Sequence, residues 1–525
     1  MHIIAAVRNR IDRFLRFFEN PEIPFHRHLI TFAAVILLRQ VLEMFSTGHT
    51  MSAAEIVHYF LWYAGTAACL IWILQLAIRG EPARVARVVT SGYVLVLLAP
   101  ILDLLISPGV PSPMKYLQGS WPELLRHYGT FCFRCGARGF SIGMKIEIAV
   151  VFVLALIYLA VKIRRPLRII LSLFRMYTAL FAFGLVGKIV YDLYDLLFRS
   201  VGAVVVTIDD RAMGAFLFLP AAVFVILALR KASPAIFRAL GRDLRPLAIL
   251  HYVAVFVIGY LLWRNVMDRS TLPGGTAAAF VRLDHRIFGF LLVPVSLVGG
   301  AIFSIVTNNL SDTAADRASH PERPHVAGSV PLATYRAVGW WSLSASLAAA
   351  ALAGGLSLLF LGVMVGGYAL YSMPPLRLKR VPVVGKLLIG TNSVAAALAG
   401  FTLFGGEVGA FPPLYIAFFC GPFALAANAL DLGDVEGDRS AGIRTLAVIL
   451  GPTRARWAAA LFTVGAYVMM GLMLGDLRLV GPLLLLASSH TYAVLRRPFR
   501  PAAVLLVNAA AMTALAVVLG FRAAG

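Results

Sequence analysis

The run IFGFLLVPVSLVGGAIFSIVT (residues 287–307) is followed at once by NNLSDTAADRASHPERP (residues 308–324). A second apolar run ends near residue 430 and leads in the same way into NALDLGDVEGDRSAGIRT (residues 428–445). The chain has 25 Asp and Glu residues, and seven of them fall in these two stretches. Carboxylates at the end of a membrane-length run are costly to desolvate, so their concentration there indicates a function.

The composition is that of a protein that crosses a membrane many times. Of the 525 residues, 60% are hydrophobic, which is more than a soluble chain of this length can cover. Apolar runs of about 18–25 residues recur, and this is the length that spans a bilayer as a helix. Such continuous runs exclude barrel strands. The sequence therefore predicts an all-α integral membrane protein, with about six spans before residue 240 and nine after it.

Three regions are expected along the chain. Residues 1–28 carry apolar side chains at helical spacing with Arg between them, which predicts an amphipathic interfacial helix rather than a cleaved signal peptide. The polar segment 230–246 separates an N-terminal helical domain (29–235), to which the sequence assigns no role, from a C-terminal domain (240–525). Cys132 and Cys135 form a single CxxC, for which a disulfide or no bond is expected, because one pair cannot complete a zinc site.

The positive charge follows membrane topology. The net charge is +22, and Lys and Arg gather in alternate loops, among them 79–87, 162–168, 230–245 and 371–380. This asymmetry predicts a cytoplasmic N-terminus and places both acidic stretches on the cytoplasmic side. The loop 264–286 is an exception, since it carries four Arg on the opposite side. Contact with anionic membrane lipids accounts for the charge, and nucleic acid is not expected as a partner.

The spacing of the acidic residues predicts a metal site. Asn308, Asp312 and Asp316 are four residues apart, which places their side chains on one stripe of a helix. The second stretch repeats this pattern in steps of three, three and four residues, at Asn428, Asp431, Asp434 and Asp438. Such oxygen-bearing side chains suit Mg²⁺, which also binds waters and substrate phosphates. Two faces of this kind opposite each other would hold a metal-bridged diphosphate.

A diphosphate needs cations besides the metal. The segment YSMPPLRLKR (residues 371–380) supplies Arg377, Lys379 and Arg380 after two prolines that end a helix. Guanidinium groups pair with phosphate oxygens, and Lys adds a point charge. Basic residues after a span more often only set topology. Three further residues are candidates for the diphosphate: Arg323, Tyr371 and Arg444.

Residues 240–525 resemble the UbiA-type intramembrane prenyltransferase superfamily. The first stretch is similar to its NxxxDxxxD motif, with PERP similar to a following PxRP element. The second is similar to its DxxxD motif (Asp434, Asp438), with Asp431 as a further acid, and YSMPPLRLKR is similar to a third signature. SHPERPHVAG departs from the family pattern, because it lacks the usual Asn-Lys before PxRP and Ser-Gly after it. The six N-terminal spans lie outside the resemblance.

The resemblance implies a nine-helix bundle around a central cavity, capped by the motif loops. It implies Mg²⁺-dependent transfer of a prenyl chain from a prenyl diphosphate to an acceptor within the membrane. Asp312, Asp316, Asp434 and Asp438 would be the catalytic carboxylates. The metal ligands would be these four with Asn308 and Asp431. The diphosphate would contact Asn308, Arg323, Tyr371, Arg377, Lys379, Arg380 and Arg444.

The acceptor is left open by the sequence. The pairing of YSMPPLRLKR with DVEGDR resembles the branch of the family that includes the homogentisate, menaquinone and chlorophyll prenyltransferases, and this resemblance implies an aromatic or ring acceptor in the biosynthesis of a quinone-like lipid. A glycerol-phosphate lipid, haem or phosphosugar acceptor on the same metal platform is the alternative. A lipid transporter or binding scaffold is the non-enzyme alternative, although transporters place polar sites near the bilayer midplane rather than at span ends. No protein partner is indicated.

Overall fold

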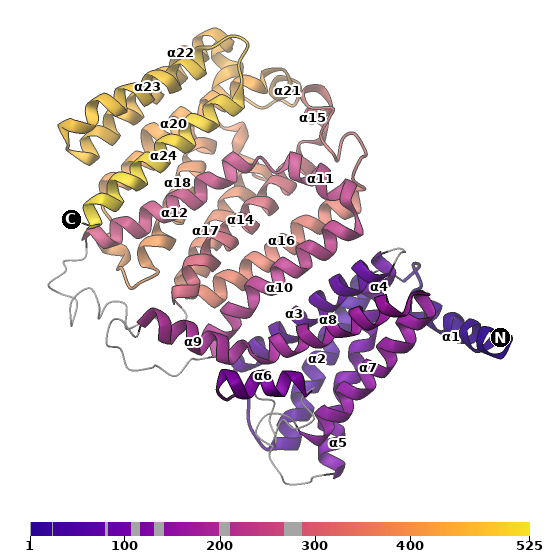
Figure 1. The fold of residues 1–525 in the computed structure, drawn as a ribbon. Helices are drawn as coiled ribbons and strands as arrows, with labels where there is room; N and C mark the ends of the chain where they lie inside the picture. Colours follow the sequence, from indigo (N-terminus) through magenta and orange to yellow (C-terminus); the bar gives the residue numbers. More distant parts are fainter. Residues whose placement is uncertain are drawn as a thin grey trace. The chain divides into compact units, whose positions relative to one another are not determined.

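The computed structural model describes residues 2–23, 25–78, 82–106, 116–130, 141–198, 210–266 and 286–524. Cys132 and Cys135 lie outside the described residues. The described chain is helical and contains no strand. It divides into two compact units, Met1–Pro234 (unit 1) and Ala235–Gly525 (unit 2), which are drawn in Figure 1.

Unit 1 consists of membrane-length helices joined by short ones. Its elements are α1 (His2–Phe18), α2 (Phe25–Thr47), α3 (Ala53–Ala77), α4 (Pro82–Gly92), η1 (Tyr93–Leu97), α5 (Leu98–Ile106), α6 (Trp121–Gly129), α7 (Ile142–Lys162), α8 (Pro166–Gly184), α9 (Val186–Phe198) and α10 (Asp210–Ala232). The most extensive packing joins α3 to α10, and α3 also packs against α8. The long apolar run at 169–198 is interrupted at Leu185, where α8 ends.

Unit 2 contains nine long helical segments among its described residues. The helices are α12 (Pro246–Val266), α14 (Arg286–Ser311), α16 (Leu332–Ala353), α17 (Gly355–Ser372), α18 (Val384–Thr402), α22 (Leu446–Leu474), α23 (Val480–Leu495) and α24 (Pro501–Ala524), with the composite span that begins at α19. That span runs through α19 (Pro413–Phe418), η5 (Phe419–Phe423), α20 (Ala424–Ala426) and η6 (Ala427–Gly433). Shorter elements are α11 (Pro234–Asp243), which starts at the unit boundary, α15 (Thr313–Ser319), η3 (Leu378–Arg380), η4 (Val408–Ala410), α21 (Val435–Ser440) and η7 (Leu477–Leu479).

Thirteen helical segments of the described chain are long and apolar enough to cross a membrane. Every run expected to span the bilayer forms a helix or a chain of short helices, although α16 and α23 are outside the thirteen. The prediction of an all-α, multi-pass integral membrane protein is therefore confirmed.

Unit 2 is held together by close approach of helix backbones. Helix α12 packs against both α18 and α24. A Cβ atom on Gly259 of α12 would lie 1.8 Å from the carbonyl oxygen of Ala397, and one on Gly400 of α18 would lie 2.0 Å from that of Phe256. Only glycine permits this contact, and small residues at helix interfaces drive association where lipid offers no hydrophobic gain.

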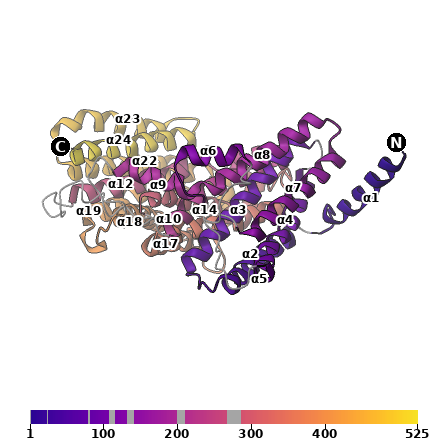
Figure 2. The same cartoon turned by 60° about the horizontal axis from the view of Figure 1, so that its bottom comes forward.

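The composite span is bent, and the bend positions the second acidic stretch. A π-type turn covers Phe419–Phe423, with Pro422 inside it and non-helical dihedral angles at Gly421. Proline removes a backbone donor and disrupts the helix ladder. Figure 2 shows the following helices α22, α23 and α24 side by side. Of the short elements that carry acidic residues, α15 follows α14, and η6 and α21 precede α22.

Candidate functional site

The two acidic stretches face each other. The first begins at the end of α14, continues through Asp312 and forms α15. Its backbone hydrogen bonds from Asp312 N to Asn308 O (2.9 Å) and from Asp316 N to Asp312 O (2.8 Å) keep the three side chains one above another. The second stretch ends in α21, which packs directly against α15. The motifs, over a hundred residues apart in sequence, therefore meet in one place.

The second stretch differs from the regular α-helical face that the spacing predicted. Residues Ala427–Gly433 form a 3₁₀ helix, and Asp434 separates it from α21. A 3₁₀ helix has three residues per turn, so side chains at i and i+3 eclipse each other. Asn428 and Asp431 are three residues apart and therefore align along this tighter helix, and Asp434 follows at its C-cap.

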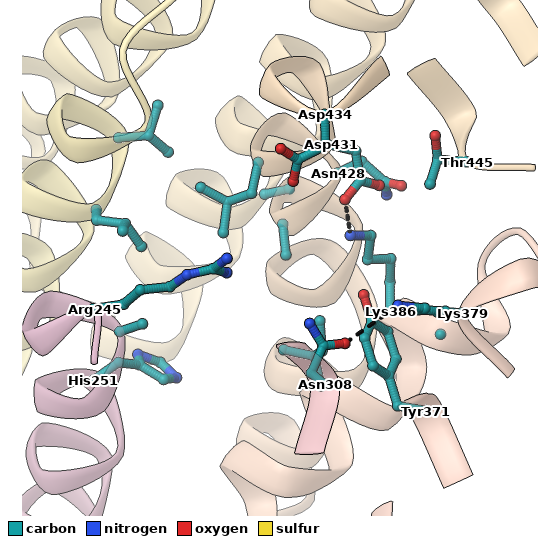
Figure 3. A pocket seen from close by; sticks show the side chains of 18 of the residues that line it. Arg245, His251, Asn308, Tyr371, Lys379, Lys386, Asn428, Asp431, Asp434 and Thr445 are labelled. Atoms are coloured by element: carbon teal, nitrogen blue, oxygen red, sulfur yellow. Dashed lines mark hydrogen bonds and ion pairs between the residues drawn. The ribbon is translucent and has the colours of Figure 1, made fainter. Parts of the chain in front are cut away.

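The acidic residues line one end of a cavity of about 320 Å³ in unit 2. Asn308, Asn428 and the carboxylates of both stretches are among its lining residues, and its other walls are largely apolar and aromatic. Figure 3 shows Arg245 on one side of this cavity, with Asn308 and Lys386 on the other. The apolar part of the wall is formed by Ile249, Phe418, Phe423, Met470, Leu505 and Met512.

The carboxylates of the first stretch are paired with cations. Asp312 accepts from Arg377 Nη2 at 2.5 Å and from Lys379 Nζ. Asp316 accepts from Arg323 Nη1 at 2.6 Å. Burial raises the pKa of Asp316 while Arg323 lowers it, with the balance upward. Burial also lowers the pKa of Lys379, and Asp312 opposes that shift. Each side chain is stabilised in its charged form mainly by its partner.

The second stretch holds more negative charge than its partners neutralise. Asp431 accepts from Lys386 Nζ at 2.6 Å, and its other oxygen is buried with no hydrogen-bond partner among the described residues. Asp434 contacts His320 Nε2 at 2.8 Å. Burial, and then repulsion from Asp431 and Asp434, raises the pKa of Asp438 to about 7. Adjacent carboxylates with one orphaned oxygen form a site that attracts a further cation.

A buried network beneath the first stretch orients Arg323. Asn309 donates from Nδ2 to Asp243 Oδ2 (3.1 Å) and to the Tyr335 hydroxyl (2.9 Å), and Tyr335 also donates to Asp243. Arg323 Nη1 donates to Asn309 Oδ1 at 3.3 Å as well as to Asp316. These contacts fix the guanidinium beside the carboxylate, which makes Asn309 a positioning residue.

The basic candidates from the sequence fall into two groups. Lys379, Arg323 and Tyr371 line the cavity, and Arg377 reaches it through Asp312. Arg380 and Arg444 are exposed and are not among the residues that line it. For Arg380, the role of topology determinant, which the sequence analysis weighed for residues 371–380, fits this exposed position better than contact with the diphosphate.

Three cavity residues were missed by the sequence analysis: Lys386, His320 and Arg245. Lys386 is the next cation after YSMPPLRLKR, so an extension of that segment by six residues would have included it. His320 lies between the first stretch and PERP. Arg245 precedes the first proline of α12 and has left-handed backbone dihedral angles, with φ of 46°. Nothing in its spacing distinguishes it from the other arginines between the spans.

No group of three or more His, Cys, Asp or Glu side chains in the described chain is assembled to hold a metal ion. Asp312, Asp316 and Asp431 are instead paired with Arg or Lys side chains. A magnesium site built from one or two carboxylates, waters and substrate phosphates does not require such a cage. The donor set of hard oxygens, with the orphaned oxygen of Asp431, therefore fits Mg²⁺ together with a phosphate ligand.

The fold and site define a multi-pass membrane protein whose apolar cavity has a carboxylate- and cation-lined end. The model of the UbiA prenyltransferase family matches residues 270–503. The digeranylgeranylglyceryl phosphate synthase of Methanoculleus marisnigri is 30% identical over 229 residues, covering 38% of this chain and 78% of the synthase. The chain belongs to the UbiA prenyltransferase family.

Other relatives are named for a different acceptor. The homogentisate phytyltransferase of Synechocystis is 32% identical over 186 residues, covering 33% of this chain and 58% of that enzyme. Across the curated relatives compared, the chain spans between 44% and 78% of the relative's length. A solved UbiA homologue from Archaeoglobus fulgidus, bound to GPP and Mg²⁺, is 19% identical with a TM-score of 0.41, covering 55% of this chain and all of the homologue. Unit 1 lies before the family match.

Proposed function

We propose that this protein transfers a prenyl chain from a prenyl diphosphate to an acceptor within the membrane, with Mg²⁺ as cofactor. The observation that carries the proposal is one cavity with opposed carboxylates at one end and apolar walls beyond them. A prenyl diphosphate has the same division, with charge at one end and hydrocarbon at the other. Membership of the UbiA prenyltransferase family supports the same activity.

The metal is assigned to Asp312, Asp316, Asp431, Asp434 and Asp438 with Asn308, and Asp312, Asp316, Asp434 and Asp438 are proposed as the catalytic carboxylates. When bound, Mg²⁺ would supply positive charge that stabilises the diphosphate as it leaves. For these carboxylates to bind metal, the cations that hold them must move to other partners. The phosphate oxygens are suitable partners, because guanidinium and ammonium groups bind carboxylate and phosphate by the same charge-assisted hydrogen bonds.

The protein groups then act on the diphosphate. Arg323, Arg377 and Lys379 would turn from Asp316 and Asp312 to the phosphate oxygens, where negative charge grows as the C–O bond breaks. The electron pair of that bond leaves with the diphosphate, and an allylic cation remains on the prenyl chain. A nucleophilic atom of the acceptor forms the new bond and loses a proton. The apolar wall excludes water, which would otherwise capture the cation.

Arg245 is assigned to the acceptor. Its guanidinium lines the cavity, and no ion pair to it is found among the described residues. An unpaired guanidinium beside a reaction cavity favours a substrate with an acidic group. We propose a ring acceptor that carries such a group, in the biosynthesis of a quinone-like lipid. A glyceryl phosphate acceptor is the second candidate, because it would satisfy Arg245 equally and is favoured by the Methanoculleus relative.

We also propose that the N-terminus and the site face the cytoplasm, on the evidence of the Lys and Arg distribution. In a variant without native cysteines, a cysteine at Arg380 should react with a membrane-impermeant maleimide only after cells are opened. A cysteine at Glu407, at the other end of α18, should react in intact cells. The reverse labelling pattern would contradict the orientation.

The function is tested by product analysis. Purified full-length protein in lipid nanodiscs would be given Mg²⁺, geranylgeranyl diphosphate and, separately, homogentisate or geranylgeranylglyceryl phosphate. A prenylated product with one acceptor, identified by mass spectrometry, is expected. Arg245→Gln should raise KM for that acceptor and leave KM for the donor nearly unchanged. Absence of product with ring and glyceryl phosphate acceptors alike would contradict the proposed acceptor classes.

A further inference from the structure

Unit 1 has a cavity of its own, separate from the acidic motifs. It has a volume of about 510 Å³ and lies between the C-terminal end of α3, the first half of α8 and the end of α10. These three helices pack together within unit 1 through α3, which contacts both of the others. The cavity is therefore formed by elements of one unit.

The described charged residues that line this cavity are all positive. Arg168, Arg175 and Lys231 line it, and the described residues around it contribute no acidic side chain. No ion pair or side-chain hydrogen bond of these three cations is found in the described chain. Arg168 and Arg175 are seven residues apart on α8, so they share a helix face. Three like charges around one hollow repel each other unless an anion lies between them.

Membrane topology alone does not account for this arrangement. The positive-inside rule places Lys and Arg in loops next to span ends, as at Arg164, Arg165 and Arg230. Arg175 lies nine residues after the first residue of α8, Pro166, which is more than two turns into the span. An ionisable residue there is costly and is retained for a partner.

The edge of the cavity is apolar and faces outward. Leu76 is 49% exposed and Leu171 is 42% exposed, and both line the cavity. In a membrane-spanning unit, such surfaces contact lipid chains. Gln75 adds a polar contact, because its Nε2 donates to Pro82 O at 3.1 Å while its Oε1 is buried with no partner among the described residues. That oxygen can accept from a headgroup hydroxyl.

We propose that this cavity binds the phosphate-bearing headgroup of a membrane lipid. Arg168, Arg175 and Lys231 would contact the phosphate, Gln75 a hydroxyl of the headgroup, and Leu76 and Leu171 the start of the hydrocarbon chain. The phosphate could be that of an anionic phospholipid or of a prenyl diphosphate. This site is independent of the proposed transfer reaction and does not need a metal ion, since the protein supplies the positive charge.

The test measures lipid binding to the full-length protein in nanodiscs of zwitterionic lipid, with EDTA present to prevent metal-dependent binding in unit 2. The probes are phosphatidylglycerol, geranylgeranyl diphosphate and inorganic diphosphate. The variant Arg168→Gln/Arg175→Gln/Lys231→Gln is compared with the control Arg164→Gln/Arg165→Gln/Arg230→Gln. The control removes the same charge from neighbouring positions that do not line the cavity.

The proposal expects at least a tenfold loss of affinity for one lipid probe in the first variant and little change in the control. The probe that shows this loss identifies the source of the phosphate. The single variant Arg175→Gln should show a smaller loss of affinity. Its thermal unfolding is measured as well, so that the proposal can still be tested if the triple variant misfolds. Equal affinities in both triple variants, no binding by the native protein, or binding of inorganic diphosphate as tight as that of either lipid would overturn the proposal.

Discussion

The side chains of the cavity in unit 2 form an exchangeable set of charges. In the structure, Arg323, Arg377 and Lys379 neutralise Asp316 and Asp312. When metal and diphosphate bind, the carboxylates would coordinate the metal and the cations would bind the phosphate oxygens. In both arrangements these five side chains are paired, which matters because an unpaired buried charge costs several kcal/mol. Binding of the metal alone would leave the cations without partners, and binding of the diphosphate alone would leave the carboxylates without partners.

This exchange predicts that metal and diphosphate bind cooperatively. Mg²⁺ should bind the free protein weakly, because it must displace Arg377 and Lys379 from Asp312. A prenyl thiodiphosphate, which is cleaved slowly, should raise the affinity for Mg²⁺ at least tenfold, and Mg²⁺ should raise the affinity for the analogue by the same factor. Calorimetry with each ligand in the presence and absence of the other checks this. Independent binding of the two would contradict the exchange.

A second prediction at this scale concerns Lys386. The Lys386→Met substitution leaves Asp431 buried beside Asp434 and Asp438 without the cation that is paired with it. Breaking a buried ion pair costs about 3–5 kcal/mol, so thermal unfolding should occur at a clearly lower temperature. Arg380→Met, at an exposed position on the preceding segment, is the control and should change little.

The double variant Lys386→Met/Asp431→Leu distinguishes the cost of an unpaired carboxylate from the cost of lost side-chain packing. Replacement of both charges removes the unpaired carboxylate, so it should recover most of the stability that Lys386→Met loses. If Lys386→Met is as stable as the native protein, then the pair does not contribute as described.

At the scale of helices and loops, the sequence predicted the spans well because an apolar run of membrane length has few alternatives. It could not predict that Ala427–Gly433 forms a 3₁₀ helix, because spacings of three and four suit either helix type until the neighbouring bend at Gly421–Pro422 is known. Spacing identified the acidic residues. It could not identify Lys386 or His320, because their role depends on which distant elements pack beside them.

The contact between α12 and α18 provides a prediction at the same scale. Gly259→Ala would place a methyl group 1.8 Å from the Ala397 carbonyl oxygen, so the helices must separate. Overpacking of this kind costs about 1–3 kcal/mol, and the temperature of thermal unfolding should fall. Gly362→Ala in α17, where no atom lies within 4 Å of the added Cβ, is the matched control. Equal unfolding temperatures would show that this packing does not hold unit 2 together.

At the scale of the whole molecule, all the residues assigned to metal, diphosphate and acceptor lie in unit 2. The two units meet between Pro234 and Ala235. The role of unit 1 could not be predicted, since its cations are spread over residues 168–231 and gather only through helix packing.

The division into units predicts that residues 233–525 alone bind a prenyl thiodiphosphate in a Mg²⁺-dependent manner, with an affinity close to that of the full chain. The truncated chain should lose the lipid binding assigned to unit 1. Binding in nanodiscs by both chains checks this, with thermal unfolding to establish that the truncated chain is folded. Loss of Mg²⁺-dependent binding by a folded truncated chain would show that unit 1 contributes to the site.

The central claim is that the two opposed acidic stretches bind a metal that activates a prenyl diphosphate. The most direct measurement is Mg²⁺-dependent release of diphosphate from geranylgeranyl diphosphate, in the presence of the acceptor that yields product, by the full-length protein. Asp312→Asn and Asp434→Asn should each lower kcat at least a hundredfold, whereas Arg444→Gln, outside the cavity, should retain activity close to native. Near-native release by both Asp variants, or release that is unchanged in EDTA, would contradict the account.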